Sequence, residues 1–530
     1  MNYYSVGWPS SFCNMKQLGF LSLAAGVLII AKLGRSLYIT WLGSARLPPS
    51  PTKHWFWGNK EFLTQPHRHA LLGTKYKAEL GNIISIVTPM DTNIFLNTID
   101  LATELLEKHA AVTADRPRNV MSNEILGWGT SPAFRQHDEV HKKMRRVMAS
   151  ALHPAAARSY SSQHLDMTLK FLRRIAAKPT SFLELPNQMN GAFMISLAYG
   201  YVPQEGKDPL ISFVHEAVRF FALSLTNYYL VNDFPILKHV PTWFPGAGFK
   251  RFGEKGSNMR TSYANKTFNM VFEQVQNGRV DRPSYVSSLL ESKGGVNVSE
   301  GDIELIKWTA TSLFGAGTTT IGSVVNSFFL VACLYPEVMK KAQAEIDSSV
   351  GRERIPNLDD RSSLPYTNAL VLEIMRMWPP VPLGVGHVAT EDIDFGEYRI
   401  PKGTTINANI WAMLRDPKYF PFPHIFNPSR FLKANPEPDP RKYIFGFGRR
   451  TCPGLHVANN GAWIMCAGLL SVFNISASPQ LELKVARLGG RESEKLYELW
   501  EPYGVNDLLP FDCEIKVRDS AATSILEHTS

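Results

Sequence analysis

Phe445-Gly-Phe-Gly-Arg-Arg-Thr-Cys-Pro-Gly454 is a glycine-rich segment that places one cysteine, Cys452, directly before an apolar helix. Its glycines allow backbone conformations closed to other residues and let the chain approach a flat partner. Because Pro453 suits the first turn of a helix, Cys452 is predicted to lie at a helix N-terminus, where free N–H groups favour a thiolate. Arg450 adds a positive charge. The pattern favours an iron with one axial thiolate and a macrocycle that carries carboxylates.

Other roles for Cys452 fit its surroundings less well. The apolar residues after it recur every three or four positions, which predicts a buried helix beside which a cysteine is often purely structural; they are Leu455, Ala458, Ala462, Met465, Leu469 and Phe473. A zinc site lacks ligands, because the next cysteine, Cys466, lies within that helix and the chain has no Cys-x-x-Cys pair. The missing pair also excludes covalent attachment of a c-type haem.

The composition is that of a large globular protein. The 530 residues include 56 basic and 47 acidic side chains, a net charge of +9 that is spread along the chain. This distribution suits an anionic membrane surface or an acidic redox partner, and it is not the footprint of a nucleic-acid-binding protein. The five cysteines are an odd, sparse set, which argues against a disulfide framework and favours a reducing compartment.

The glycine-rich segment resembles the haem-binding signature of the cytochrome P-450 family, F-x-x-G-x-R-x-C-x-G, at every fixed position; these are Phe445, Gly448, Arg450, Cys452 and Gly454. The resemblance covers nearly all of the chain after Pro48. It implies a mainly α-helical fold with a small β region, preceded by an N-terminal membrane anchor helix. It also implies haem b as the cofactor, with the Cys452 thiolate as axial ligand and Arg450, Phe445 and Gly454 beside the haem.

Residues 303–335 form the longest apolar helical run and end before a proline, which predicts a buried central helix. Within it lies Phe314-Gly-Ala-Gly-Thr-Thr-Thr-Ile321, whose glycines each cost about 1 kcal/mol in a helix and so indicate close approach to a ligand. The family pattern here is A/G-G-x-D/E-T, so the resemblance makes Thr320 the threonine that assists proton delivery. Thr319 replaces the family's acid, and a hydroxyl can relay a proton but cannot supply one as a carboxyl does. Packing alone is the other explanation of the threonines.

Residues 365–377 are predicted to form a helix with a proline in its first turn. Glu373 and Arg376 lie three residues apart on one face, a pattern that is usually only a surface pair. At this distance before the cysteine, the resemblance makes them a buried pair that Arg430 completes. Ser429 replaces the acid that usually precedes this arginine. The three residues are expected to be structural rather than catalytic.

Residues 139–152 are predicted to form a basic helix. The family usually has W-x-x-x-R here, and its two side chains hold a haem propionate; in this chain Arg145 matches and His141 replaces the tryptophan. A solvated face that docks a reductase is the alternative for the neighbouring Lys142, Lys143 and Arg146. His387 lies at a position that often holds a propionate-binding residue in the family, with a surface role as its alternative.

Residues 1–46 are predicted to form an N-terminal membrane anchor, because residues 18–31 are uncharged and almost wholly apolar. A cleaved secretory signal is the alternative. Lys32 and Arg35 favour an uncleaved anchor with the following chain in the cytoplasm. Residues 47–52 resemble the proline-rich hinge of microsomal P-450s. A catalytic domain over 53–518 and a flexible tail over 519–530 complete the predicted organisation.

Further elements follow from local patterns. Alternating apolar residues predict a hairpin over 83–97 and a strand–turn–strand unit over 393–409. Residues 116–136 are expected to form a long loop, and 476–517 short strands and turns, with 503–505 entering the substrate cavity as the family implies. Residues 233–246, rich in proline and aromatic residues, resemble a loop of basidiomycete natural-product P-450s.

The resemblance implies a haem-dependent monooxygenase of the endoplasmic reticulum membrane, with its catalytic domain on the cytosolic face. It would oxidise a lipophilic small molecule with O2 in fungal secondary metabolism, and terpenoids are the favoured class of substrate. NADPH–cytochrome P-450 reductase, or cytochrome b5 in addition, would supply electrons, because the chain has no strand–GxGxxG–helix unit. Thr319 supports one alternative, a haem-thiolate isomerase or peroxide-using enzyme. A non-enzymatic haem sensor is another.

Overall fold

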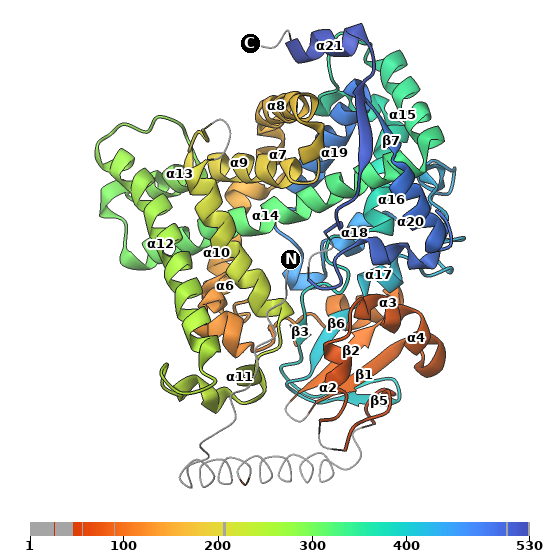
Figure 1. Cartoon of the computed structure of the whole chain (residues 1–530). Helices are drawn as coiled ribbons and strands as arrows, with labels where there is room; N and C mark the ends of the chain where they lie inside the picture. Colours follow the sequence, from red (N-terminus) through yellow and green to blue (C-terminus); the bar gives the residue numbers. More distant parts are fainter. Residues whose placement is uncertain are drawn as a thin grey trace.

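The molecule is mainly α-helical, and its long helices are arranged around one central helix, α14 (Figure 1). The computed structural model describes residues 46–55, 57–88, 91–204, 208–504 and 507–527, together with Gly26. The longer helices are α6 (Glu139–Leu152), α8 (Ser161–Ala177), α9 (Leu185–Tyr199), α10 (Pro209–Thr226), α12 (Gly248–Gln276), α13 (Tyr285–Ser292), α14 (Glu300–Leu334), α15 (Pro336–Ser349), α16 (Pro365–Met377), α19 (Leu455–Val472), α20 (Pro479–Arg487) and α21 (Ser520–Glu527). Shorter helices connect them, namely α2 (Lys60–Leu63), α3 (Arg68–Gly73), α4 (Lys75–Leu80), α5 (Ile99–Thr103), α7 (Pro154–Ser159), α11 (Leu230–Asp233), α17 (Ile410–Met413) and α18 (Arg441–Ile444).

The central helix α14 has clear start and stop signals. Its cap residue Ser299 accepts a hydrogen bond from the Asp302 N–H at 3.2 Å, and Pro336 begins the next helix. α9 packs along α14, and α6, α12, α13, α16 and α19 also contact it. Among the described residues α14 is the one helix long and apolar enough to cross a membrane, yet 83% of its apolar window is buried inside the molecule. We therefore assign α14 to the core, as the sequence predicts.

Three small β-sheets accompany the helices in the part of the chain that the structure describes. The largest has the order β1-β2-β6-β3, built from β1 (Ile83–Val87), β2 (Thr92–Leu96), β6 (Thr405–Ala408) and β3 (His387–Val388). β1 and β2 pair antiparallel, with Ile83 opposite Leu96, which confirms the predicted hairpin. The other two sheets are the pairs β4 (Ile393–Phe395) with β5 (Tyr398–Ile400) and β7 (Phe473–Ala477) with β8 (Cys513–Val517).

Three predictions of local structure need correction. The turn at 401–403 joins β5 and β6, which lie in different sheets, because β6 pairs with β2 and β3. Residues 116–136 are not an uninterrupted loop, since they contain short helical turns at Val120–Ile125 and Trp128–Thr130. The C-terminal part holds α20 in place of a turn and α21 in place of the flexible tail; Ala522 and Ile525 of α21 are buried, and α21 contacts α8 and α19.

The predicted anchor of residues 1–46 lies outside the described residues, apart from Gly26 and Arg46. The proline-rich segment after it is held against β1. Ser85 Oγ donates a hydrogen bond to Pro48 O at 2.7 Å, and the Ser85 N–H donates to Pro49 O at 2.8 Å. These contacts hold Pro48 and Pro49 of the predicted hinge against the folded domain.

Candidate functional site

Cys452 lies in the loop between α18 and α19, and this loop is closed by a hydrogen bond from the Cys452 N–H to Phe445 O at 2.7 Å. Two glycines of the loop serve different purposes. Gly448 has φ +53°, and a Cβ there would lie 2.3 Å from Leu106 O, so the backbone needs both its conformation and its space. Gly454 has an ordinary φ of −87°, and a Cβ there would lie 3.9 Å from Cys452 Sγ. Gly454 therefore leaves space beside the thiol.

The pKa of the Cys452 thiol is subject to opposing influences. Burial raises this pKa above its ordinary value, whereas a hydrogen bond from the Gly454 N–H and the positive charge of Arg145 lower it. Burial has the largest effect, so the polypeptide alone favours the thiol. This corrects the expectation that the helix N-terminus by itself favours a thiolate. A coordinated metal ion deprotonates a thiol outright, so the thiolate is a property of the metal-bound site.

Arg450 and Arg116 are buried guanidinium groups whose hydrogen bonds to described residues all go to backbone carbonyl groups. Arg450 Nε donates to Ala114 O at 2.5 Å, and Arg116 Nη1 donates to Gly386 O at 2.8 Å. Burial lowers the pKa of Arg116 to about 9, and the nearby charges of Arg450 and Arg145 add to this effect. Burial likewise lowers the pKa of Arg450 to about 10. No sequence motif marks Arg116, so the structure alone reveals it.

Two buried histidines face these arginines. His141, on α6, has its Nδ1 3.2 Å from His137 Nδ1, and His387, at the start of β3, has its Nδ1 2.8 Å from Thr113 O. Burial has the largest effect on both pKa values and, with the neighbouring arginine charges, lowers each to about 3. Both rings are therefore neutral at physiological pH and can donate or accept a hydrogen bond without adding charge.

Arg145 links this group to the cysteine. It lies one turn after His141 on α6, and its charge and that of Cys452 influence each other's pKa. Its side chain forms no hydrogen bond or ion pair with another residue that the structure describes. We define the basic cluster as Arg116, Arg145, Arg450, His141 and His387. The basic cluster and its immediate surroundings hold four arginines and two aspartates, so positive charges exceed negative ones by two. The arginines are Arg116, Arg135, Arg145 and Arg450, and the aspartates are Asp115 and Asp138.

The middle of α14 is accessible on one side although the second half of the helix is wholly buried. Ala316 is exposed and Thr319 and Thr320 are half-buried, whereas every residue from Ile321 to Leu334 is buried. Thr320 Oγ donates to Ala316 O at 2.8 Å, so its oxygen remains able to accept a hydrogen bond. Thr319 Oγ has no hydrogen-bond partner among the described residues. This accessible turn is where α14 can meet a bound molecule.

The glycines of α14 are explained by helix packing. A Cβ at Gly317 would lie 2.6 Å from Met194 Cε, and one at Gly322 would lie 1.9 Å from Asn187 Oδ1, and both neighbours belong to α9. The expectation that the glycines admit a ligand is therefore wrong for Gly317. Gly315 is different, since a Cβ there would have no neighbour closer than 3.7 Å.

The three residues predicted to form a buried charge cluster do meet. Glu373 accepts hydrogen bonds from Arg376 Nε at 2.7 Å and Arg430 Nε at 3.0 Å, and the three side chains are 0%, 0% and 2% exposed. Arg430 also forms a buried ion pair with Glu437, which no sequence motif marks. Glu437 thus supplies a carboxylate that Ser429 cannot. Among the described residues, no hydrogen bond or ion pair joins this group to the basic cluster.

The segment expected to enter the substrate cavity is described only in part. Tyr503 is 39% exposed, and its hydroxyl donates to Thr64 O at 3.1 Å, just after α2. Val505 lies outside the described residues. The structure therefore shows the base of this segment, which contacts the N-terminal helices.

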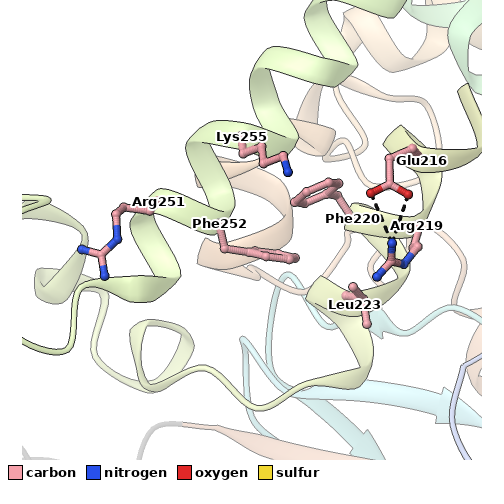
Figure 2. Close-up of a pocket in the computed structure, with 7 residues that line it drawn as sticks. All are labelled: Glu216, Arg219, Phe220, Leu223, Arg251, Phe252 and Lys255. Carbon is pink, nitrogen blue, oxygen red and sulfur yellow. Dashed lines mark hydrogen bonds and ion pairs between the residues drawn. The ribbon is translucent and has the colours of Figure 1, made fainter. Parts of the chain in front are cut away.

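Two surface pockets lie away from the cysteine loop. One, of about 480 Å³, opens between α10 and α12, where Phe220 and Phe252 form apolar walls and Lys255 lies over the Phe220 ring (Figure 2). At its edge Arg219 pairs with Glu216. The other lies between α6 and the start of α14. No residue of the basic cluster lines either pocket.

Comparison with known proteins agrees with this arrangement. A family model described as Cytochrome P450 matches residues 48–487. The chain is 35% identical to cytochrome P450 monooxygenase 208 of Postia placenta, over 96% of this chain and 97% of the relative. It is 34% identical to cytochrome P450 monooxygenase claR of Ampulloclitocybe clavipes, over 95% and 92%, and 35% identical to cytochrome P450 monooxygenase ppsD of Aspergillus oryzae, over 91% and 90%. The chain therefore belongs to the cytochrome P450 family, a class of monooxygenases that carry haem b on a cysteine thiolate.

Proposed function

We propose that Cys452 is the axial ligand of haem b and that the basic cluster holds the haem propionates. The observation that supports this most is the excess of two positive charges beside the cysteine, in a partly buried place where unpaired charges are costly. Two carboxylates there would neutralise the excess. Phe445 and Gly454 flank the ligand in its loop. When bound, the haem supplies the oxygen-activation chemistry, and its thiolate ligand favours O–O cleavage.

The absorption spectrum of the reduced, CO-bound protein tests this proposal. Wild-type protein in a membrane fraction is expected to show the band characteristic of thiolate-ligated haem, and Cys452→Ala is expected to lose it. Cys466→Ala is the matched control, because Cys466 is buried in α19 well beyond the ligand loop and should leave the band unchanged. A folded wild-type protein without this band would contradict the assignment.

We propose that Thr320 and Thr319 handle protons at the accessible turn of α14. The Thr320 oxygen can accept a hydrogen bond from a molecule beside the helix while its own hydrogen stays on Ala316 O. Thr319 presents a hydroxyl that is not used inside the helix. Thr319 can therefore relay a proton, and Thr320 can hold the molecule that receives it, although neither can act as the source of a proton at neutral pH.

We propose NADPH–cytochrome P450 reductase as the electron donor, with cytochrome b5 as a further partner. The exposed basic side chains Lys142, Lys143 and Arg146 on α6 support a docking surface for an acidic partner close to the cofactor. The substrate would be a lipophilic small molecule of fungal secondary metabolism, and terpenoids are the favoured class. This part of the proposal is supported by the fungal relatives named above and by the apolar composition of α14.

We propose that the protein is held at the endoplasmic reticulum membrane by its N-terminal segment. Exposed apolar side chains support contact with a membrane in two further places, before α2 and around α11; they are Trp55, Trp57, Tyr228, Leu230, Ile236, Trp243 and Phe244. The two places adjoin each other, because Lys60 Nζ lies 4.1 Å from both the Trp57 and the Tyr228 ring centroids. An exposed apolar patch of this kind is typical of a membrane-contacting surface.

Reconstitution with the reductase tests the electron donor and the class of reaction together. Oxidation of a panel of lipophilic compounds should require NADPH, reductase and O2. Lys143→Glu should raise the reductase concentration needed for half-maximal rate, and Lys170→Glu, which reverses an exposed charge on α8, should not. Product formation with hydrogen peroxide alone, at the same rate, would favour the peroxide-using alternative.

A further inference from the structure

The molecule contains a partly buried carboxyl group close to α14, although the helix itself lacks the expected acid. Asp507, which follows the segment 501–504, accepts a hydrogen bond from Asn326 Nδ2 of α14 at 3.2 Å. Asn326 is itself buried, in the wholly buried second half of the helix. Removing an amide and a carboxyl group from water costs free energy, and this hydrogen bond offsets only part of that cost.

Asn326 and Thr319 lie on the same face of α14. Seven residues correspond to almost two complete turns, so the two side chains point in nearly the same direction, roughly 10 Å apart along the helix axis. Between them on this face lie Gly322 and the buried Ser323. Asp507 therefore lies at one end of a line of positions whose other end is the accessible turn of Thr319.

Two acceptor atoms along this line have no hydrogen-bond partner among the residues that the structure describes. Asn187 Oδ1, from α9, occupies the space that a Cβ at Gly322 would take, and it is buried without a hydrogen bond. Asn326 Oδ1 is also buried without one. Buried polar atoms in native proteins are normally satisfied by protein or by water. The two amide oxygens thus offer binding positions for water molecules between Asp507 and Thr319.

The environment of Asp507 favours its protonated form. Burial raises the pKa of its carboxyl group above the ordinary value, and the hydrogen bonds from Asn326 and from the Leu508 N–H oppose this only in part. Asp507 is itself only partly buried, so it keeps some contact with solvent. The raised pKa makes Asp507 a weaker acid than an exposed aspartate, which is what a proton source near neutral pH requires.

We propose that Asp507 is the proton source for the Thr319–Thr320 turn and takes the place of the carboxyl group that α14 lacks. A proton leaves the Asp507 carboxyl and passes along the polar atoms and water of this face to Thr319, whose hydroxyl gives up its own proton to the molecule held beside Thr320. The resulting Asp507 carboxylate is then reprotonated by solvent. No electrons move in this step. Asp507 does not touch the reacting atoms itself, because Thr319 and water lie between them. The proposal rests on the proposed role of Thr320.

The test uses the full-length enzyme with NADPH–cytochrome P450 reductase in membranes and without added substrate. Asp507→Asn keeps the shape and the contact with Asn326 but carries no acidic proton. We expect NADPH consumption to slow about 10-fold or more, since a general acid typically contributes ~10²–10⁴-fold and water replaces part of it. We also expect a larger solvent deuterium isotope effect. Asp507→Glu should retain most of the rate, and Asp512→Asn, an exposed acid of the same segment, should change nothing.

Two further measurements separate proton supply from a structural role. The infrared carboxylic-acid C=O band of the resting protein should lose intensity in Asp507→Asn and not in Asp512→Asn. Thr319→Glu, which returns an acid to α14, should restore NADPH consumption in the Asp507→Asn background. A normal rate in Asp507→Asn, an ionised Asp507, or a defect that Thr319→Glu does not repair would each overturn the proposal. Wild-type protein without the thiolate–CO band would instead overturn the proposed function, and this inference with it.

Discussion

At the scale of single residues, the molecule depends on charges that are buried but paired. Glu373 lies between two arginines, and the three side chains are removed from water almost completely. The pair Arg430–Glu437 extends the group, and Asn427 N–H adds a hydrogen bond to Glu373 at 2.9 Å. Such a network stabilises little relative to apolar packing, but the loss of one partner leaves an uncompensated charge.

Glu373→Gln should therefore destabilise the protein by about 3–5 kcal/mol, because two buried guanidinium groups lose their shared carboxylate. Chemical denaturation followed by circular dichroism measures this change. Glu353→Gln is a suitable control, since Glu353 is exposed and forms no ion pair with a described residue. A midpoint equal to that of the control would show that the group is not needed for stability.

His164 is a second buried polar residue whose behaviour can be measured. It stacks on Phe193 with ring centroids 4.2 Å apart, both ring nitrogens lack a partner among the described residues, and burial lowers its pKa to about 4. The unfolded chain binds a proton near pH 6.5, whereas the folded protein binds it only near pH 4, so stability is lost as pH falls through this window. At pH 5 the loss is about 2 kcal/mol.

His164→Phe should remove this part of the pH dependence, since phenylalanine keeps the stacking and has no titrating group. The unfolding midpoints of wild type and variant are measured at pH 7.5 and at pH 5, and the difference between the two proteins at one pH is compared with the difference at the other. The variant should gain relative stability at the lower pH. An identical pH dependence in both proteins would mean that His164 is not neutral and buried in solution.

At the scale of elements, the helix boundaries were the most predictable feature and the contacts between helices were the least. The bounds of α6 and α16 agree with the predicted ones because capping residues and prolines act locally. The glycines of α14 were assigned to a ligand because the sequence does not show that α9 lies against them. The roles of Arg116 and Asp507 are hidden from the sequence for the same reason, because their partners lie far away in the chain. Glu437 lies close to its partner Arg430 in the chain, but no motif marks it.

The contact between α9 and α14 can be tested with glycine substitutions. Gly322→Ala should destabilise the protein by about 1–3 kcal/mol, because the new Cβ would meet Asn187 Oδ1 at 1.9 Å. Gly315→Ala is the control: its Cβ would meet Val218 Cγ2 at 3.7 Å, an ordinary contact, and alanine should stabilise the helix by up to about 1 kcal/mol. Thermal unfolding of both variants distinguishes the effects. Equal shifts of the same sign would mean that α9 does not limit the space at Gly322.

At the scale of the whole molecule, the C-terminal segment completes the helical core. α21 places Ala522 and Ile525 against the rest of the protein, and Arg173 Nε donates to Leu526 O at 2.8 Å. A short polar segment at the end of a chain gives little sign of this in its sequence, because its apolar residues are few and their partners lie on α8 and α19. The catalytic domain therefore extends further than the sequence predicts.

Ile525→Ala should destabilise the protein by about 2 kcal/mol, at the lower end of the range for a buried isoleucine because the helix is terminal. Thr523→Ala, at an exposed position of the same helix, should have little effect. Limited proteolysis should release the C-terminus faster from Ile525→Ala than from either other protein. Equal release from all three would mean that α21 does not hold the C-terminus in place.

Lys60 has a practical consequence for anyone who purifies this protein. Its ammonium group lies over the Trp57 and Tyr228 rings and forms an ion pair with Asp233 at 3.2 Å. Lys60 therefore connects the segment before α2 to the region around α11. A shortened version that starts at residue 46 would still present Trp55, Ile236 and Trp243, which are 84%, 72% and 78% exposed. The shortened protein would therefore keep an exposed apolar surface. Replacing these three side chains with polar ones, rather than trimming the chain further, is the route to a monodisperse sample for crystallisation.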